Sequence, residues 1–94
     1  MYLGSYDFDG DPAELVPAYD RLMAGFPPDM MMLHVCVVRD DGITVFDACP
    51  SPEVFREFST GPEFAGAIAQ AGLPTPRITE RGHVHNAKLR ELVD

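Results

Sequence analysis

The sequence has little of several features that define common protein classes. Basic residues are few, with 7 Lys and Arg against 15 Asp and Glu, and the net charge is −8 at pH 7. Nucleic-acid affinity depends on clustered Lys and Arg, so this balance argues against a nucleic-acid partner. No apolar run approaches the length of a membrane span. We therefore expect a globular domain that engages neither nucleic acid nor membrane.

Cysteines and targeting signals are also scarce. Cys36 and Cys49 are the two cysteines, and no basic segment followed by an apolar one opens the chain. We expect no export signal, a cytoplasmic location and two free thiols. No Cys-x-x-Cys or His-Glu-x-x-His pattern occurs, so we expect no metal. With 94 residues, the chain predicts a single domain, 1–94, with a tail from about residue 87.

Residues 30–49, MMMLHVCVVRDDGITVFDAC, predict a β-hairpin around which the rest is organised. Asp41-Gly42 separates two apolar runs and is typical of a two-residue type I′ turn. One face of such a hairpin mixes apolar residues with an imidazole, a carboxylate and two thiols, and the other face is apolar. The predicted register places Val38 opposite Val45, Cys36 opposite Asp47, and His34 opposite Cys49.

The flanking segments predict two more strands and two helices. Residues 2–8 alternate as a strand, and a helix follows over residues 11–26, where Asp11 is the expected N-cap and Pro17 predicts a kink or a delayed start. A second helix starts after Ser51, is interrupted at residues 59–62 and ends at Gly72. Residues 77–85 predict an edge strand. This order, βαββαβ, is the ferredoxin-like α+β arrangement with an antiparallel four-stranded sheet.

The first strand of the hairpin is apolar on both faces until Arg39. Such a strand is covered on both sides, whereas a chain this short covers only one face of a sheet. The sequence therefore predicts that a second copy covers the other face. The expected product is a homodimeric α+β barrel.

In the layout of its strands and helices, the chain resembles the dimeric α+β barrel superfamily, in particular small antibiotic biosynthesis monooxygenase-like proteins. The matching segments are HVCVVRDDGITVFDACPSPEVF, EFAGAIAQAGLPTP and the terminal VHN at residues 84–86. The resemblance implies a homodimer with a pocket for a small organic molecule between sheet and helices. Members include cofactor-free quinone-forming monooxygenases, lactone isomerases and haem-binding proteins. This chain has no Trp and no match to the Asn and Trp that the cofactor-free oxygenases offer on their second helix.

The pair His34 and Asp47 is the candidate catalytic site. A carboxylate beside an imidazole can orient it to accept or deliver a proton. The structural alternative is a core histidine that Asp47 merely satisfies. The candidate ligand-binding residues are Tyr6, Cys36, Phe58, Phe64 and His85.

These observations favour a small-molecule-binding homodimer without a cofactor. If the protein is an enzyme, the leading interpretation is an isomerase or monooxygenase-like activity on a small aromatic or polyketide-like compound. Two alternatives stay open. One is a non-catalytic dimeric binding or assembly domain, and the other is a metal or haem protein ligated by His83 and His85.

Overall fold

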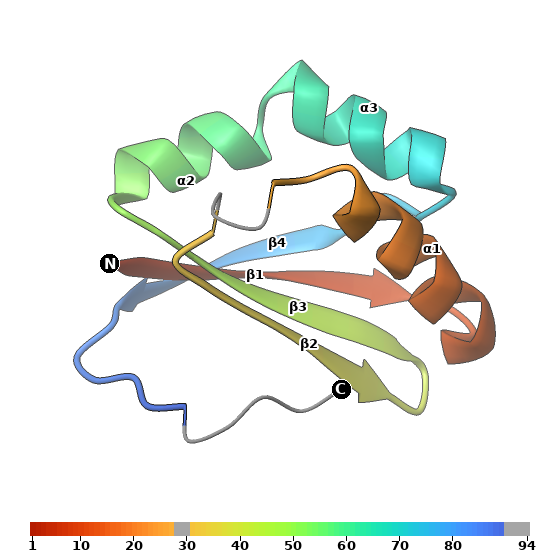
Figure 1. Ribbon diagram of the computed structural model, residues 1–94, viewed down its shortest axis with the longest axis horizontal. Helices are drawn as coiled ribbons and strands as arrows, with labels where there is room; N and C mark the ends of the chain where they lie inside the picture. Colours follow the sequence, from red (N-terminus) through yellow and green to blue (C-terminus); the bar gives the residue numbers. More distant parts are fainter. Residues whose placement is uncertain (28–30, 90–94) are drawn as a thin grey trace.

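The computed structural model describes residues 1–27 and 31–89, which form one layer of strands and one layer of helices. The elements in chain order are β1 (Tyr2–Asp9), α1 (Pro12–Ala24), β2 (Leu33–Arg39), β3 (Gly42–Cys49), α2 (Pro52–Ser59), α3 (Pro62–Ala71) and β4 (Arg77–His83). All strand pairs are antiparallel, in the order β2-β3-β1-β4. The helices cover one face of the sheet (Figure 1). The predicted ferredoxin-like α+β fold is confirmed. None of the described helices is long and apolar enough to cross a membrane.

Both helical segments start as the sequence predicts. The side chain of Asp11 accepts a hydrogen bond from a first-turn amide of α1, and Ser51 does the same for α2. Each cap is followed by a proline, whose missing N–H costs nothing at the first helical position. The delayed start considered at Pro17 is wrong, because α1 runs without interruption from Pro12 through this residue. Pro17 is exposed, and its ring removes a single helical hydrogen bond.

The predicted interruption of the second helix is also found, and it divides the segment into α2 and α3. The helix ends at Gly72, whose φ of 88° is the left-handed conformation that glycine adopts most readily. The next residue, Leu73, donates its N–H to the carbonyl of Ile68 and buries its side chain. This is the Schellman type of helix end, with its accompanying apolar contact.

The hairpin register differs from the predicted one by two residues. Asp40 and Asp41 form the turn, and Arg39 lies opposite Gly42. His34 therefore lies directly opposite Asp47 rather than diagonal to it. The reason is that Gly42 is needed inside β3, where an added Cβ would come within 2.1 Å of the carbonyl oxygen of Phe8 on β1. A shift by two residues preserves the faces, so the composition of each face is as predicted.

The last strand is shorter than predicted. β4 ends at His83, and His85 lies beyond it in a tail that is followed to residue 89; residues 90–94 of the predicted tail lie outside the described residues. A β-bulge opposite Leu3 and Gly4 shifts the register, so His83 lies opposite Tyr2 on the helix-covered face. β4 occupies a sheet edge, as predicted.

The helix-covered face carries the core. It is the mixed face of the hairpin, the one with His34 and Asp47, together with the aromatic residues of β1. The ring of Phe55 from α2 is fully buried against Gly4, where an added Cβ would lie 2.1 Å from ring carbons. None of the described helices lies over the opposite face, and Val35 and Val37 there are 43% and 41% exposed.

Candidate functional site

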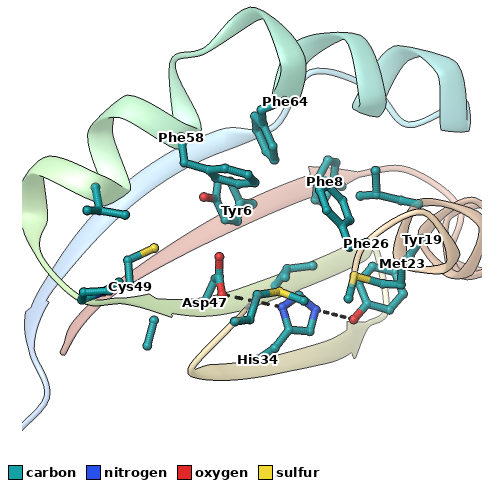
Figure 2. Close-up of a pocket in the computed structure, with 16 residues that line it drawn as sticks. Tyr6, Phe8, Tyr19, Met23, Phe26, His34, Asp47, Cys49, Phe58 and Phe64 are labelled. Atoms are coloured by element: carbon teal, nitrogen blue, oxygen red, sulfur yellow. Dashed lines mark hydrogen bonds and ion pairs between the residues drawn. The ribbon is translucent and has the colours of Figure 1, made fainter. Parts of the chain in front are cut away.

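A cavity of about 140 Å³ lies between the helix layer and the centre of the sheet (Figure 2). Its floor consists of residues from β1, β2 and β3, and its walls come from all three helices. Most of the lining is apolar or aromatic, with a few polar side chains on the sheet side. The lining residues are Tyr6, Phe8, Tyr19, Leu22, Met23, Phe26, Met31, His34, Val45, Asp47, Ala48, Cys49, Pro50, Val54, Phe58 and Phe64.

The imidazole of His34 is held between two oxygen-bearing side chains. Its Nε2 is 2.5 Å from Oη of Tyr19, which α1 places over β2 with its ring nearly parallel to the imidazole. Its Nδ1 is 3.8 Å from Oδ1 of Asp47. That separation is within reach of an ion pair but too long for a hydrogen bond. The Asp47 carboxylate therefore faces Nδ1 of His34 at ion-pair distance.

Three buried polar atoms of this cavity have no hydrogen-bond partner among the described residues. They are Oη of Tyr6, Nδ1 of His34 and Oδ1 of Asp47. Tyr6 and Asp47 are 3% and 5% exposed. Leaving a buried polar atom unpaired costs roughly 1–3 kcal/mol. Buried polar atoms of this kind call for a partner such as water, an ion or a bound molecule.

The ionisation of the tyrosines follows from this environment. Burial, with the Asp47 charge adding to it, raises the pKa of Tyr6 well above its ordinary value. Burial raises the pKa of Tyr19 to about 12, and the nearby acidic groups Cys36, Asp20 and Asp47 add to the effect. Both phenols keep their protons at neutral pH and are available as hydrogen-bond donors.

Both cysteines are free. Burial raises the pKa of Cys36 and of Cys49, with a smaller contribution from a neighbouring carboxylate in each case. Such thiols stay protonated and are poor nucleophiles. They contribute apolar volume here.

The structure brings most of the candidate residues together. His34 and Asp47 face each other on the cavity floor, and Tyr6, Phe58 and Phe64 line the same cavity. The rings of Phe58 and Phe64 lie 5.0 Å apart, and Tyr6 lies 5.1 Å from Phe64 (Figure 2).

Two candidates lie elsewhere. Cys36 is on the same sheet face but outside the cavity lining, where it packs against the core. His85 is exposed, beyond the end of β4. Within residues 1–27 and 31–89, no three His, Cys, Asp or Glu side chains gather where they could hold a metal ion. His83 instead packs edge-on against Tyr2, with ring centroids 5.1 Å apart.

Sequence reasoning missed Tyr19. This residue repeats with the apolar positions of α1, a pattern typical of a core-facing stripe. The stripe does face the core, and the hydroxyl at the end of the ring is what reaches His34. A phenol on the buried side of a helix needs a polar partner, and that requirement was the available signal.

Comparison with known proteins supports the fold. No protein-family model matches the chain, and no curated protein matches it significantly. A Deinococcus radiodurans protein described as a candidate antibiotic biosynthesis monooxygenase aligns over 99% of this chain and 100% of its own, with a TM-score of 0.59 and 9% identity. SnoaB, a cofactor-independent oxygenase from Streptomyces nogalater, aligns over 96% of this chain and 95% of its own, with a TM-score of 0.55 and 19% identity. An asparagine-to-alanine variant of SnoaB aligns over the same fractions of the two chains, with a TM-score of 0.56 and 17% identity.

The chain has the fold of these monooxygenase-type proteins. The alignments extend over nearly the whole of each chain, which confirms the predicted likeness in architecture to the antibiotic biosynthesis monooxygenase-like group. Fold does not by itself determine activity, so the function is argued from the cavity.

Proposed function

We propose that this protein binds a small organic molecule in the cavity above His34 and is a cofactor-free enzyme acting on a small aromatic or polyketide-like compound. The observation that carries the proposal is a largely apolar cavity lined by Tyr6, His34 and Asp47, each of which has a buried polar atom without a partner among the described residues. Sites for small molecules combine an apolar lining with a few placed polar groups in this way. The fold shared with a cofactor-independent oxygenase supports it.

In this proposal His34 and Asp47 form the proton-transfer pair. His34 donates a hydrogen bond through Nδ1–H, or accepts the substrate proton at Nδ1 when Nε2 carries the proton. Tyr19 serves both tautomers, because its hydroxyl donates to a bare Nε2 and accepts from Nε2–H. Asp47 stabilises the imidazolium that forms when His34 takes a proton. Tyr6, Phe58 and Phe64 hold the ligand ring.

Two reaction types use this arrangement. In an isomerisation, the pair removes a proton from a carbon or oxygen acid and returns it at another position, so no oxidant is required. In an oxygenation, the deprotonated substrate supplies the electrons and O₂ is the oxidant, so that an activated CH₂ group and O₂ give a carbonyl group and water. Oxygen consumption separates the two reactions.

The test is His34→Ala beside His85→Ala. We expect turnover of an accepted aromatic substrate to fall roughly 10²–10⁴-fold in His34→Ala, the range for loss of a general acid–base group. His85→Ala, which changes an exposed histidine outside the cavity, should retain the turnover of the unmodified protein. Circular dichroism checks that both variants fold. Unchanged turnover and ligand binding in His34→Ala would contradict the proposal.

We also propose that the protein is a homodimer in which the open sheet faces of two copies meet. Val35 and Val37 on this face are more than one-third exposed, and Leu3, Leu33 and Phe46 beside them are half-buried. An apolar sheet face of this kind is typically covered by a partner. A cytoplasmic location is consistent with the two free thiols. Sedimentation of a stable monomer at micromolar concentration would contradict the dimer.

A further inference from the structure

The cavity continues into an outer groove between the helices. Apolar residues from the segment after α1, from α2 and from α3 line both spaces, and they are Phe26, Val54, Phe58 and Phe64. The ring of Phe58 lies 6.3 Å from that of Phe26 and 5.0 Å from that of Phe64. A ligand can therefore place an apolar body against these rings and extend a polar end into the groove.

The polar side chains of the groove are acidic. Glu57 on α2 and Glu63 in the first turn of α3 line it, and both are exposed. Neither carboxylate forms an ion pair with another side chain of the described residues. A charged group that enters the groove therefore meets two carboxylates.

The inner end of the cavity carries a third carboxylate. Asp47 is 5% exposed, and its carboxylate points from β3 toward the helix layer (Figure 2). Its charge acts on a ligand without contact, because a Coulomb interaction extends over several ångströms and is screened little among apolar groups. His34 lies 3.8 Å from it, so at neutral pH the pair is negative or neutral. The inner end of the cavity therefore offers an anion no net positive charge.

No described Lys or Arg side chain lines the cavity or the groove. Arg56 lies on the same helix as Glu57, but its guanidinium donates to both carboxylate oxygens of Glu80. The other described arginines are also bound elsewhere: Arg21 to the carbonyl of Ala71, Arg39 to Thr44 and Asp41, Arg77 to Asp9, and Arg81 to Ser5. An anionic ligand would thus be repelled at the groove, whereas a cationic one would be attracted. Aromatic rings such as those of Phe26 and Phe58 also favour a cation over an anion.

We infer that the cavity and the groove together bind an aromatic amine, whose rings pack against Phe58 and Phe64 and whose ammonium group lies beside Glu57 and Glu63. This inference rests on the proposed function only in using the same cavity. It names the charge and class of the ligand and does not depend on catalysis.

The test is calorimetric titration of the unmodified protein with three compounds that share a naphthyl body. They are 2-(2-naphthyl)ethylamine, which is a cation at neutral pH, the uncharged 2-(2-naphthyl)ethanol, and the anion 2-naphthylacetate. We expect the amine to bind with one molecule per chain and at least about 10-fold more tightly than the carboxylate, with the alcohol between them. High salt should reduce this preference, because exposed carboxylates are screened.

A double variant assigns the preference to the groove. In Glu57→Gln/Glu63→Gln, the preference for the amine over the carboxylate should fall to about 3-fold or less, and the affinity for the alcohol should stay within about 2-fold. Glu14→Gln/Asp40→Asn is the control, because it removes two charges at exposed residues that line neither space. It should keep the preference.

Tighter binding of the carboxylate, equal binding of all three compounds or no binding of the amine overturns the inference. So does a preference that persists in Glu57→Gln/Glu63→Gln, or one that the control variant loses equally, since the net charge of the protein would then be its cause. Amine binding without turnover of any aromatic compound keeps the inference and overturns the proposed enzyme. Turnover of an anionic aromatic substrate that binds more tightly than the amine does the reverse.

Discussion

Buried polar side chains on the two faces of the sheet differ in how fully they are hydrogen-bonded. On the open face, Ser5 is fully buried and accepts a hydrogen bond from Nε of Arg81 at 2.9 Å. Thr44 accepts from Nε of Arg39 at 2.9 Å and donates to Asp7 at 2.6 Å. On the helix-covered face, three side chains that line the cavity each have one buried polar atom without a partner in the part of the chain that the structure describes.

This difference separates polar groups that the fold satisfies from polar groups that the described residues leave unpaired. Polar groups that only serve the fold are paired within the chain, as on the open face. On the helix-covered face, atoms without a partner among the described residues belong to side chains that line a cavity, and they cost stability there. The open face instead leaves apolar side chains exposed, as expected of a surface that meets another subunit.

The largest effect is expected from a charge placed on the open face of β2, and the same charge on the other face of β2 is the control. Val37→Asp puts a carboxylate on the open face, whereas Val38→Asp puts one on the opposite face at a side chain that is already 60% exposed. A two-fold dimer contains each substitution twice, and an unpaired buried charge costs about 3–5 kcal/mol. We expect Val37→Asp to raise the dimer dissociation constant at least about 1,000-fold and Val38→Asp to leave it within about 3-fold.

Analytical ultracentrifugation across a concentration series measures both constants. Equal weakening of the dimer by the two substitutions would show that the open face is not the contact surface.

The second effect concerns how closely a helix approaches the sheet. Gly4 lies opposite Asp47 on β3 and leaves room for the ring of Phe55, which a Cβ would overlap at 2.1 Å. Because that ring is fully buried and cannot move aside, we expect Gly4→Ala to lower the free energy of unfolding by about 3 kcal/mol. Gly66→Ala is the control, since nothing lies within 4 Å of its added Cβ on α3. It should raise stability by about 0.5–1 kcal/mol.

Urea denaturation of both variants checks this prediction. An alanine at position 4 that is tolerated as well as one at position 66 would mean that α2 does not pack on β1 as described.

Much of the fold could be predicted from local signals, but not the strand register. The caps at Asp11 and Ser51 and the end at Gly72 depend on neighbouring residues alone, and all three are found. The prediction of a turn at Asp41-Gly42 is wrong because β1 packs so closely on Gly42 that only glycine fits there. Local reasoning on the hairpin did not include this third strand. A register is fixed by the whole sheet.

The candidate site was predictable in composition but not in geometry. The parity of the strands placed His34 and Asp47 on one face, and a shift by two residues leaves that face unchanged. Tyr19 could not be assigned from sequence, because its contact with His34 depends on how α1 crosses β2. His85 could not be placed because the bulge in β4 alters the alternation before the strand ends.

A third pair of variants measures the cost of an unpaired hydroxyl. Tyr6→Phe removes an oxygen that has no partner within residues 1–27 and 31–89, so we expect the free protein to become more stable by about 1 kcal/mol. Thr44→Val on the open face removes a hydroxyl with two partners and leaves Asp7 and Arg39 short of a bond each. We expect Thr44→Val to lower the free energy of unfolding by about 1–2 kcal/mol.

Thermal denaturation without ligand measures both changes. If Tyr6→Phe were as destabilising as Thr44→Val, the Tyr6 hydroxyl would have to be paired already, and the contrast between the faces would fail.

The smallest expected effect is the response to alkaline pH, which probes the helix-covered side alone. All three tyrosines lie there: Tyr2 and Tyr6 on β1, and Tyr19 on α1. Burial raises the pKa of Tyr19 from 10.0 to about 12, so the folded protein holds this proton more tightly than the unfolded chain. The resulting stabilisation is complete below about pH 10 and is lost as the pH rises from 10 to 12. Melting temperatures between pH 8 and 11.5 should therefore fall above pH 10, and less steeply in Tyr19→Phe. The phenolate absorbance of the folded protein should lag behind that of the denatured chain. Coincident titration curves would mean that these phenols are open to solvent, and that the helices do not close the cavity over His34.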